Sequence, residues 1–145
     1  MKTMIEVWVY KHSAAGCRFL LLKRTKDNGG FWQPVVGKLE DDEQPVTGAR
    51  RELREEIGLR DTMHISEKLY EFTIDKHYKT GERIAPQIEY CYAIEVSPDT
   101  LIDITKNPDA EHDTYLWATY EEAMTLLRWD NNKDALRAIA IQRKL

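Results

Sequence analysis

One stretch, residues 37–59, constrains the fold of this chain more than any other part. It reads GKLEDDEQPVTGARRELREEIGL. Pro45 suits the first position of a helix, because its missing N–H would have had no partner there. Gly58 suits the position after a helix, because glycine accepts the left-handed conformation that a helix end needs. The stretch therefore predicts a loop followed by a helix from Pro45 to Ile57.

The predicted helix has an apolar stripe with acidic residues beside it. Its apolar residues recur at three- and four-residue steps, which gives one stripe to bury: Val46, Ala49, Leu53 and Ile57. Glu52, Glu55 and Glu56 occupy positions i, i+3 and i+4, so their carboxylates share the face beside that stripe. Like charges at this spacing cost about 0.2–0.5 kcal/mol per pair in an isolated helix.

A divalent cation relieves such repulsion. Mg²⁺ takes oxygen ligands and usually completes its coordination with water and substrate phosphate. The three glutamates therefore predict a Mg²⁺ site, with Mn²⁺ as a substitute, and a substrate that carries a di- or triphosphate. An acidic helix face in contact with solvent would account for the glutamates alone, but not for Gly37 and Glu43 at their fixed distances from them.

The whole stretch resembles the signature of the Nudix hydrolases, G-x5-E-x7-R-E-U-x-E-E-x-G-U, in which U is aliphatic. Every specified position is met between Gly37 and Leu59. The resemblance implies an α/β fold of the Nudix type, an α/β/α sandwich in which helices cover both faces of a mixed β-sheet. It also implies hydrolysis of a phosphoanhydride bond.

The same resemblance assigns roles to residues of the stretch. It gives the metal ions four ligands: Glu52, Glu55, Glu56 and the carbonyl of Gly37. It places Arg51 and Glu52 among the candidate catalytic residues. Glu43 and Arg51 are also expected to brace the loop and the helix.

Three further segments resemble one branch of the family, the dihydroneopterin triphosphate pyrophosphatases, which are often grouped with dATP pyrophosphohydrolases. The segments are residues 31–33 (FWQ), Glu111-His112 followed by Tyr115 and Trp117, and Trp129 with Asn131 and Asn132. The resemblance implies that water attacks phosphorus in dihydroneopterin triphosphate or a dATP-like substrate and leaves the monophosphate.

Glu111 is the candidate for a further functional carboxylate outside the helix. It lies in the polar segment DAEHD, just before a predicted strand, and loops carried by a sheet are common places for catalytic groups. A water that attacks phosphorus needs a nearby acceptor for its proton. Glu111 is expected to be either that base or a metal ligand, and Asp109 and Asp113 remain alternatives.

Four residues are candidates for substrate contacts: Arg24, Trp32, Lys38 and Asn131. The guanidinium of Arg24 matches phosphate oxygens in geometry. Trp32 suits stacking on a heterocycle, although such an aromatic residue more often packs in a core. The basic segment 75–83, DKHYKTGER, is predicted to be a hairpin tip that either faces solvent or leans over a polyphosphate.

The chain has 145 residues, which suits one domain, 1–145, with a proper core. Alternating and continuous apolar patterns predict the remaining elements. These are strands at 4–12, 17–24, 31–36, 63–74, 84–96 and 114–118, and helices at 120–127 and 132–144. In the first strand, Ile5, Val7 and Val9 are expected to share one face.

Charge and composition restrict the partners and the location. The net charge of -4 argues against a broad nucleic-acid surface, and no apolar run reaches the length of a membrane span. No signal peptide follows Met1, and Cys17 and Cys91 are far apart, so reduced thiols in the cytoplasm are expected. The expected partner is a small nucleotide or pterin triphosphate, and the protein is either a monomer or a homodimer.

Two other functions stay open. Many diadenosine polyphosphate hydrolases have a tyrosine near this place in the chain, and Tyr78 lies slightly after it. That activity is the first alternative. The second is a nucleotide-binding regulator that keeps the Nudix fold without turnover. The intact motif favours an enzyme over such a regulator.

Overall fold

A seven-stranded mixed β-sheet lies at the centre of the chain within residues 1–60 and 64–145, which this computed structural model describes. The strands are β1 (Lys2–Ser13), β2 (Gly16–Arg24), β3 (Trp32–Gln33), β4 (Val35–Lys38), β5 (Tyr70–Lys76), β6 (Arg83–Glu95) and β7 (His112–Ala118). The helices are α1 (Pro45–Ile57), α2 (Tyr120–Leu126) and α3 (Asp130–Arg143), with short 3-10 turns η1 (Lys26–Asn28) and η2 (Ile104–Lys106).

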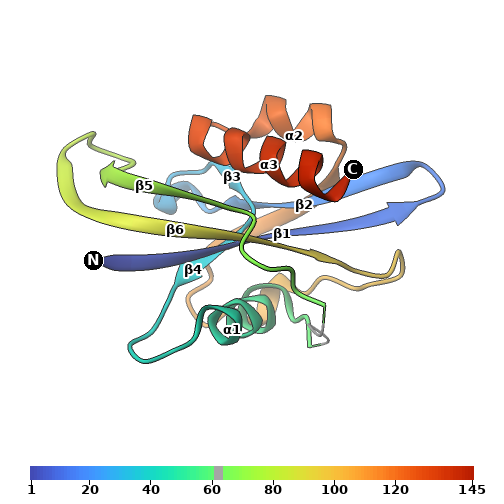
Figure 1. The fold of residues 1–145 in the computed structure, drawn as a ribbon, viewed down its shortest axis with the longest axis horizontal. Helices are drawn as coiled ribbons and strands as arrows, with labels where there is room; N and C mark the ends of the chain where they lie inside the picture. The colour runs from blue at the N-terminus through green and yellow to red at the C-terminus, as the bar shows by residue number, and fades with distance from the viewer. Residues whose placement is uncertain (61–63) are drawn as a thin grey trace.

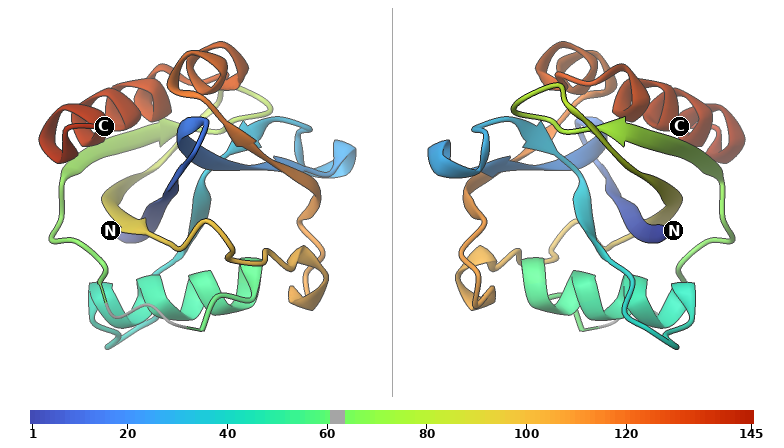
Figure 2. Two further views of the ribbon diagram at one scale, coloured as in Figure 1. Left: turned by 90° about the vertical axis from the view of Figure 1, so that its right-hand side faces the viewer. Right: turned by 90° about the vertical axis from the view of Figure 1, so that its left-hand side faces the viewer.

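Helices cover both faces of the sheet. α1 lies on one face, and α2 and α3 lie on the other (Figure 1). The two side views show the same three layers (Figure 2). This arrangement confirms the predicted α/β/α sandwich, and it places the carboxylates of α1 against the sheet.

β1 is the central strand of the sheet. It pairs in antiparallel orientation with β2 and β4 and in parallel orientation with β6. Ile5, Val7 and Val9 share the face that packs on α1, as predicted, while Trp8 and Tyr10 pack toward α2 and α3. A strand that is buried on both faces is apolar almost without interruption.

Two predicted strands differ from the observed ones. The strand expected at 31–36 is divided into β3 and β4 at Pro34, which has no N–H to donate to a strand partner. The strand expected at 63–74 begins with Met63, which lies outside the described residues, and β5 begins only at Tyr70. Before Tyr70 the backbone makes only isolated hydrogen bonds to β6 among the described residues, from Ser66 N to Ala93 O and from Leu69 N to Cys91 O.

A buried acidic cluster joins the sheet to α3. Glu6 of β1 is fully buried, and its carboxylate accepts hydrogen bonds from Trp8 Nε1 (2.7 Å), Asn132 Nδ2 (2.7 Å) and Cys91 Sγ (3.4 Å). Glu89 of β6, also buried, hydrogen-bonds to Glu6. Burial raises the pKa of both carboxyls, and the neighbouring Glu6 raises the pKa of Glu89 further. The pair is therefore stable when the Glu89 carboxyl stays protonated and its O–H donates a hydrogen bond to the Glu6 carboxylate.

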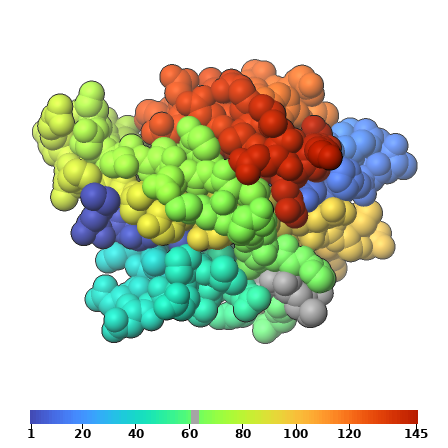
Figure 3. All heavy atoms as spheres, viewed as in Figure 1, coloured from blue at the N-terminus to red at the C-terminus, as the bar shows by residue number. Residues whose placement is uncertain are grey.

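The surface shows where the sheet extends past its helices. The hairpin formed by β5 and β6 projects at the left of the space-filling view, next to α3 (Figure 3). Among the described residues, no helix has the length and apolar character that crossing a membrane requires.

The acidic pair generates a prediction about stability and pH. Because the folded pKa of Glu89 is raised, its contribution to stability is complete below the unfolded pKa and is lost as pH rises toward the folded pKa. Glu89→Gln keeps the shape and an N–H donor but cannot ionise. As the pH rises above the ordinary pKa of a glutamate, the parent should therefore lose unfolding free energy that the variant retains, by at most about 1.4 kcal/mol per pH unit for one proton.

Urea denaturation of both proteins at several pH values measures this difference. Glu95→Gln, which changes an exposed carboxylate on the same strand, is the control. If parent and Glu89→Gln show the same pH dependence, the pair does not share a proton as described.

Candidate active site

α1 has the predicted bounds and the predicted ends. Pro45 occupies its first turn, and Gly58 follows its last turn with φ of 70°. The N–H of Gly58 donates to Arg54 O (3.1 Å), and the N–H of Leu59 donates to Leu53 O (3.2 Å). These bonds close the helix C-terminus and satisfy two of its free carbonyls.

The apolar stripe of α1 is shorter than predicted. Ala49, Leu53 and Ile57 are completely buried, but Val46 is 36% exposed, so its predicted burial is wrong. The acidic residues beside the stripe differ in burial, which argues against the alternative of an acidic face in contact with solvent. Glu52 and Glu56 are buried, whereas Glu55 is exposed to solvent.

Gly37 allows the closest approach between α1 and the sheet. It lies on β4, which pairs with β1, and a Cβ atom at this position would overlap the carboxyl group of Glu52. The φ angle of Gly37 is not in the left-handed region, so close approach is the reason for glycine here. This contact places the backbone of Gly37 directly beside the Glu52 carboxylate, as the predicted metal site requires.

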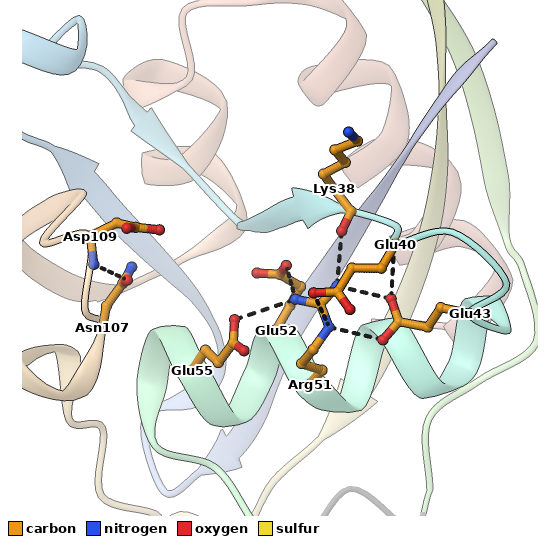
Figure 4. Close-up of polar contacts among 8 residues, drawn as sticks. All are labelled: Lys38, Glu40, Glu43, Arg51, Glu52, Glu55, Asn107 and Asp109. Atoms are coloured by element: carbon orange, nitrogen blue, oxygen red, sulfur yellow. Dashed lines mark hydrogen bonds and ion pairs between the residues drawn. The ribbon is translucent and has the colours of Figure 1, made fainter.

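Arg51 connects the loop before α1 to the acidic residues on the helix (Figure 4). Its Nε and Nη2 atoms donate to the two oxygens of Glu43, at 2.8 and 2.9 Å. Its Nη1 donates to Glu52 Oε1 (2.8 Å) and to Glu55 Oε2 (3.3 Å), and Nη2 also donates to Lys38 O (2.9 Å). The hydrogen bonds from Arg51 hold the pKa of Glu43 below its usual value. The contacts are those of a brace between loop, strand and helix.

Glu111 lies beside Glu56. One ligand atom from each of Glu56, Glu111 and His112 lies within 4.8 Å of the other two. The backbone oxygen of Glu111 accepts a hydrogen bond from Thr25 N (2.9 Å), which ties its loop to the end of β2. Asp109 and Asp113, the sequence alternatives, are both exposed.

The buried carboxylates hold their protons unusually tightly. Burial raises the pKa of Glu56 to about 9, and the negative charges of Glu111 and Glu52 add to the effect. Burial also raises the pKa of Glu52 to about 7, against the opposing effect of Arg51. Burial, and next the positive charge of Arg24, lower the pKa of His112 to about 4, so its imidazole is neutral near pH 7.

The donor set fits a divalent metal ion that prefers oxygen. Glu56 Oε2 is buried and, within the part of the chain that the structure describes, has no hydrogen-bond partner. A buried polar atom without a partner is costly, and a bound cation would satisfy it and offset the repulsion among the carboxylates. Glu52, Glu56 and Glu111 supply oxygen ligands of the kind that Mg²⁺ takes.

The four candidate substrate residues have different surroundings. Arg24 Nε donates to Asn28 O (2.7 Å), and its guanidinium lies 5.3 Å from the ring centre of Phe31 and 5.6 Å from that of Tyr78. Trp32 is half-buried and packs in the cluster beneath α2 and α3. Lys38 and Asn131 are exposed.

The basic hairpin tip leans toward η1. The ring centres of Tyr78 and Phe31 are 5.6 Å apart, and Lys79 Nζ donates to Asp27 O (2.8 Å). Phe31 also contacts Trp129, with ring centres 5.7 Å apart, so aromatic rings from three parts of the chain meet beside Arg24.

Gln33 and His112 lie in two of the segments that resemble the dihydroneopterin triphosphate pyrophosphatases, but neither was predicted to lie near Glu56. Gln33 Nε2 and His112 Nε2 are 2.9 Å apart although the residues are 79 positions apart in sequence, and His112 Nδ1 faces Glu56 Oε2 at 3.6 Å. The contact depends on β2 pairing with both β3 and β7. The local signals were the FWQ segment, which contains Gln33, and the position of His112 next to Glu111.

Comparisons with known proteins identify the family and the fold. The NUDIX domain family matches residues 3–139. The dihydroneopterin triphosphate diphosphatase of Haemophilus influenzae is 32% identical over 130 residues, which cover 83% of this chain and 77% of that protein. A solved structure from Listeria monocytogenes, assigned to the NUDIX hydrolases, has a TM-score of 0.82 and 29% identity, and the match covers 98% of this chain and 94% of that one.

One relative is much longer than this chain. The octanoyltransferase of Myxococcus xanthus is 31% identical over 135 residues, which are 92% of this chain but 35% of that protein. The chain therefore spans about a third of the length of that relative.

The close approach at Gly37 generates a prediction. In Gly37→Ala, the added methyl group would displace the Glu52 carboxyl, so Mg²⁺ affinity should fall at least about tenfold. Overpacking should also lower the unfolding free energy by about 1–3 kcal/mol. Calorimetric titration and urea denaturation measure the two effects.

Gly81→Ala is the matched control. No atom of the described residues lies within 4 Å of the position that its Cβ would take, but its φ of 70° makes the substitution strained. It should cost about 1 kcal/mol of stability and leave Mg²⁺ affinity unchanged. Equal Mg²⁺ affinities for Gly37→Ala and the parent would show that Gly37 does not shape the metal site.

Proposed function

This chain belongs to the NUDIX domain family, and from that premise we propose that it is a Mg²⁺-dependent pyrophosphohydrolase. Its substrate would be a nucleoside triphosphate-like molecule, which it would cut to the monophosphate. The observation that carries the proposal is the enclosed carboxylate site, in which Glu52 and Glu56 are buried on α1 and Glu111 lies beside Glu56. We propose that residues 1–145 act as a single catalytic domain.

We propose that Glu52, Glu55 and Glu56 hold the metal ions, together with the carbonyl of Gly37, and that Glu111 stands beside them as the base. A divalent cation at such a site neutralises phosphate charge and lowers the pKa of a bound water. Mn²⁺ is the expected substitute for Mg²⁺. Glu55 is exposed, so it would reach the site from its solvent side.

The protein groups have separate tasks in this reaction. Attack by water forms a new P–O bond and breaks a phosphoanhydride bond, with pyrophosphate as the leaving group. Glu111 accepts the proton of the attacking water, because it enters the site from a loop and not from the crowded helix. Arg51 acts on the reaction through Glu52, whose carboxylate it holds at 2.8 Å.

Two observations support a pterin or purine triphosphate. The Haemophilus influenzae relative, which matches most of both chains, is a dihydroneopterin triphosphate diphosphatase. The rings of Phe31, Tyr78 and Trp129 meet beside the guanidinium groups of Arg24 and Arg128. Aromatic and cationic groups at one place suit a flat heterocycle that carries phosphates. We rank dihydroneopterin triphosphate ahead of dATP.

Hydrolysis of a diadenosine polyphosphate is the second candidate. Tyr78 is 37% exposed at the hairpin tip and lies next to Arg24, where a second base could stack. A nucleotide-binding regulator without turnover is disfavoured, because Glu52 and Glu56 are buried on α1 and Glu111 lies beside Glu56, an arrangement that suits a metal-dependent hydrolase.

A substrate panel tests the proposed function. Purified protein with Mg²⁺ should release pyrophosphate from dihydroneopterin triphosphate with a higher kcat/KM than from any of the eight common nucleoside triphosphates. Diadenosine tetraphosphate and ADP-ribose complete the panel. A large preference for diadenosine tetraphosphate would reverse the ranking, and binding of these nucleotides without turnover of any of them would support the regulator.

The role of Glu111 generates a separate prediction. Glu111→Gln keeps the shape of the side chain but cannot accept the proton, so kcat should fall by about 10²–10⁴. KM should change far less. Steady-state kinetics with the preferred substrate measure both quantities.

Asp109→Asn and Asp113→Asn are the matched controls, because they change the exposed carboxylates on either side of Glu111. Both should retain activity within a few-fold of the parent. An impaired Asp109 or Asp113 variant, together with an active Glu111→Gln variant, would show that the base is that aspartate and not Glu111.

A further inference from the structure

Behind Glu56 lies a chain of polar contacts that the proposed reaction does not use. It begins at Arg24, whose Nη1 donates to Gln33 Oε1 at 3.5 Å. Gln33 Nε2 is 2.9 Å from His112 Nε2, and His112 Nδ1 is 3.6 Å from Glu56 Oε2. Gln33 and His112 are both buried. The chain thus connects a strand-end cation to a carboxylate of the proposed metal site.

The direction of each contact follows from the chemistry of the groups. Arginine has only donors, so Arg24 orients the Gln33 amide with its oxygen toward the guanidinium and its nitrogen toward His112. The Gln33 N–H then donates to His112 Nε2, which must be unprotonated to accept it. The proton of the imidazole is therefore on Nδ1, the atom that faces Glu56.

The gap between His112 and Glu56 is longer than a hydrogen bond. Among the described residues, His112 Nδ1 and Glu56 Oε2 are both buried without a hydrogen-bond partner. A small shift of either side chain would bring the Nδ1–H within reach of Oε2, and a carboxylate oxygen that accepts this bond keeps a second lone pair for a cation.

We infer that Gln33 and His112 are positioning residues for Glu56: Gln33 holds His112 in the Nδ1-protonated tautomer, and His112 orients the Glu56 carboxylate for the metal. The inference rests on the proposed metal site. Outer partners of this kind fix the orientation of a ligand, and their loss commonly reduces metal affinity about 10–100-fold.

The same geometry argues against His112 as a metal ligand. Its Nε2 is engaged by Gln33, and its Nδ1 carries a proton and so has no lone pair to offer. Its side chain is 1% exposed, which leaves it behind Glu56 instead of on the open side of the site.

The parent protein alone tests the first step. In the metal-free protein, ¹⁵N NMR of the His112 ring should show a protonated Nδ1 and an unprotonated Nε2, and Mg²⁺ should leave this pattern unchanged. Protonation at Nε2 would overturn the inference. Loss of the Nδ1 proton when Mg²⁺ is added would also overturn it, because His112 would then be a ligand.

Gln33→Met tests the second step. It keeps the length of the side chain but removes the donor to His112, so His112 should lose its fixed tautomer and Mg²⁺ affinity should fall about 10–100-fold. Gln142→Met is the matched control, because Gln142 donates a comparable hydrogen bond from α3 to Leu69 O (2.7 Å). The control should bind Mg²⁺ as the parent does. Equal affinities for Gln33→Met and Gln142→Met would overturn the inference.

His112→Asn and His112→Leu separate positioning from packing. The asparagine amide places an N–H near the position of Nδ1, so it should retain more Mg²⁺ affinity than leucine, and adding Gln33→Met to it should cause no further loss. Equal affinities for the two His112 variants would refute a donor role for His112. If either variant fails to fold, the tautomer in the parent protein still decides the inference.

These measurements use Mg²⁺ without substrate. A protein that shows the expected tautomer and affinity changes but hydrolyses none of the substrate panel would refute the proposed function and support the inference. A protein that hydrolyses dihydroneopterin triphosphate but has His112 protonated at Nε2 would support the proposed function and refute the inference.

Discussion

The enclosure of the Glu52 carboxyl between α1 and the backbone of β4 is the constraint on which the rest of the site depends. Only a residue without a Cβ at position 37 lets the helix come this close. Arg51 then holds Glu52 on one side and Glu43 on the other, which fixes the loop before α1. Once α1 is fixed, Glu56 is buried beside the start of β7, where His112 faces it and the preceding residue, Glu111, lies close to it.

Buried acids lie on both faces of the sheet, and their hydrogen bonding distinguishes them. Beneath α3, Glu6 accepts hydrogen bonds from Trp8, Asn132 and Cys91, so its carboxylate is satisfied by the protein. Beside α1, one oxygen of Glu56 has no such partner among the described residues. The first arrangement stabilises the fold, whereas the second fits a site completed by a cation.

Local signals predicted the parts of the structure that depend on neighbouring residues. Proline at the start and glycine at the end gave the bounds of α1, and periodicity gave the side it buries. Periodicity describes the angle around a helix but not how far the sheet extends along it, which is why the burial of Val46 was wrongly predicted. The contact between Gln33 and His112 could not be predicted, because it depends on two strands pairing with β2 across 79 residues.

Proton release on metal binding tests the central claim most directly. The pKa of Glu56 is raised to about 9, so a metal that binds its carboxylate must displace a proton. Calorimetric titration with Mg²⁺ at about pH 7.5, in buffers of different ionisation enthalpy, measures this proton in the parent and in Glu56→Gln. The account predicts release of about one proton or more by the parent, and weaker binding with less release by the variant. Equal affinity and equal proton release in the two proteins would contradict it.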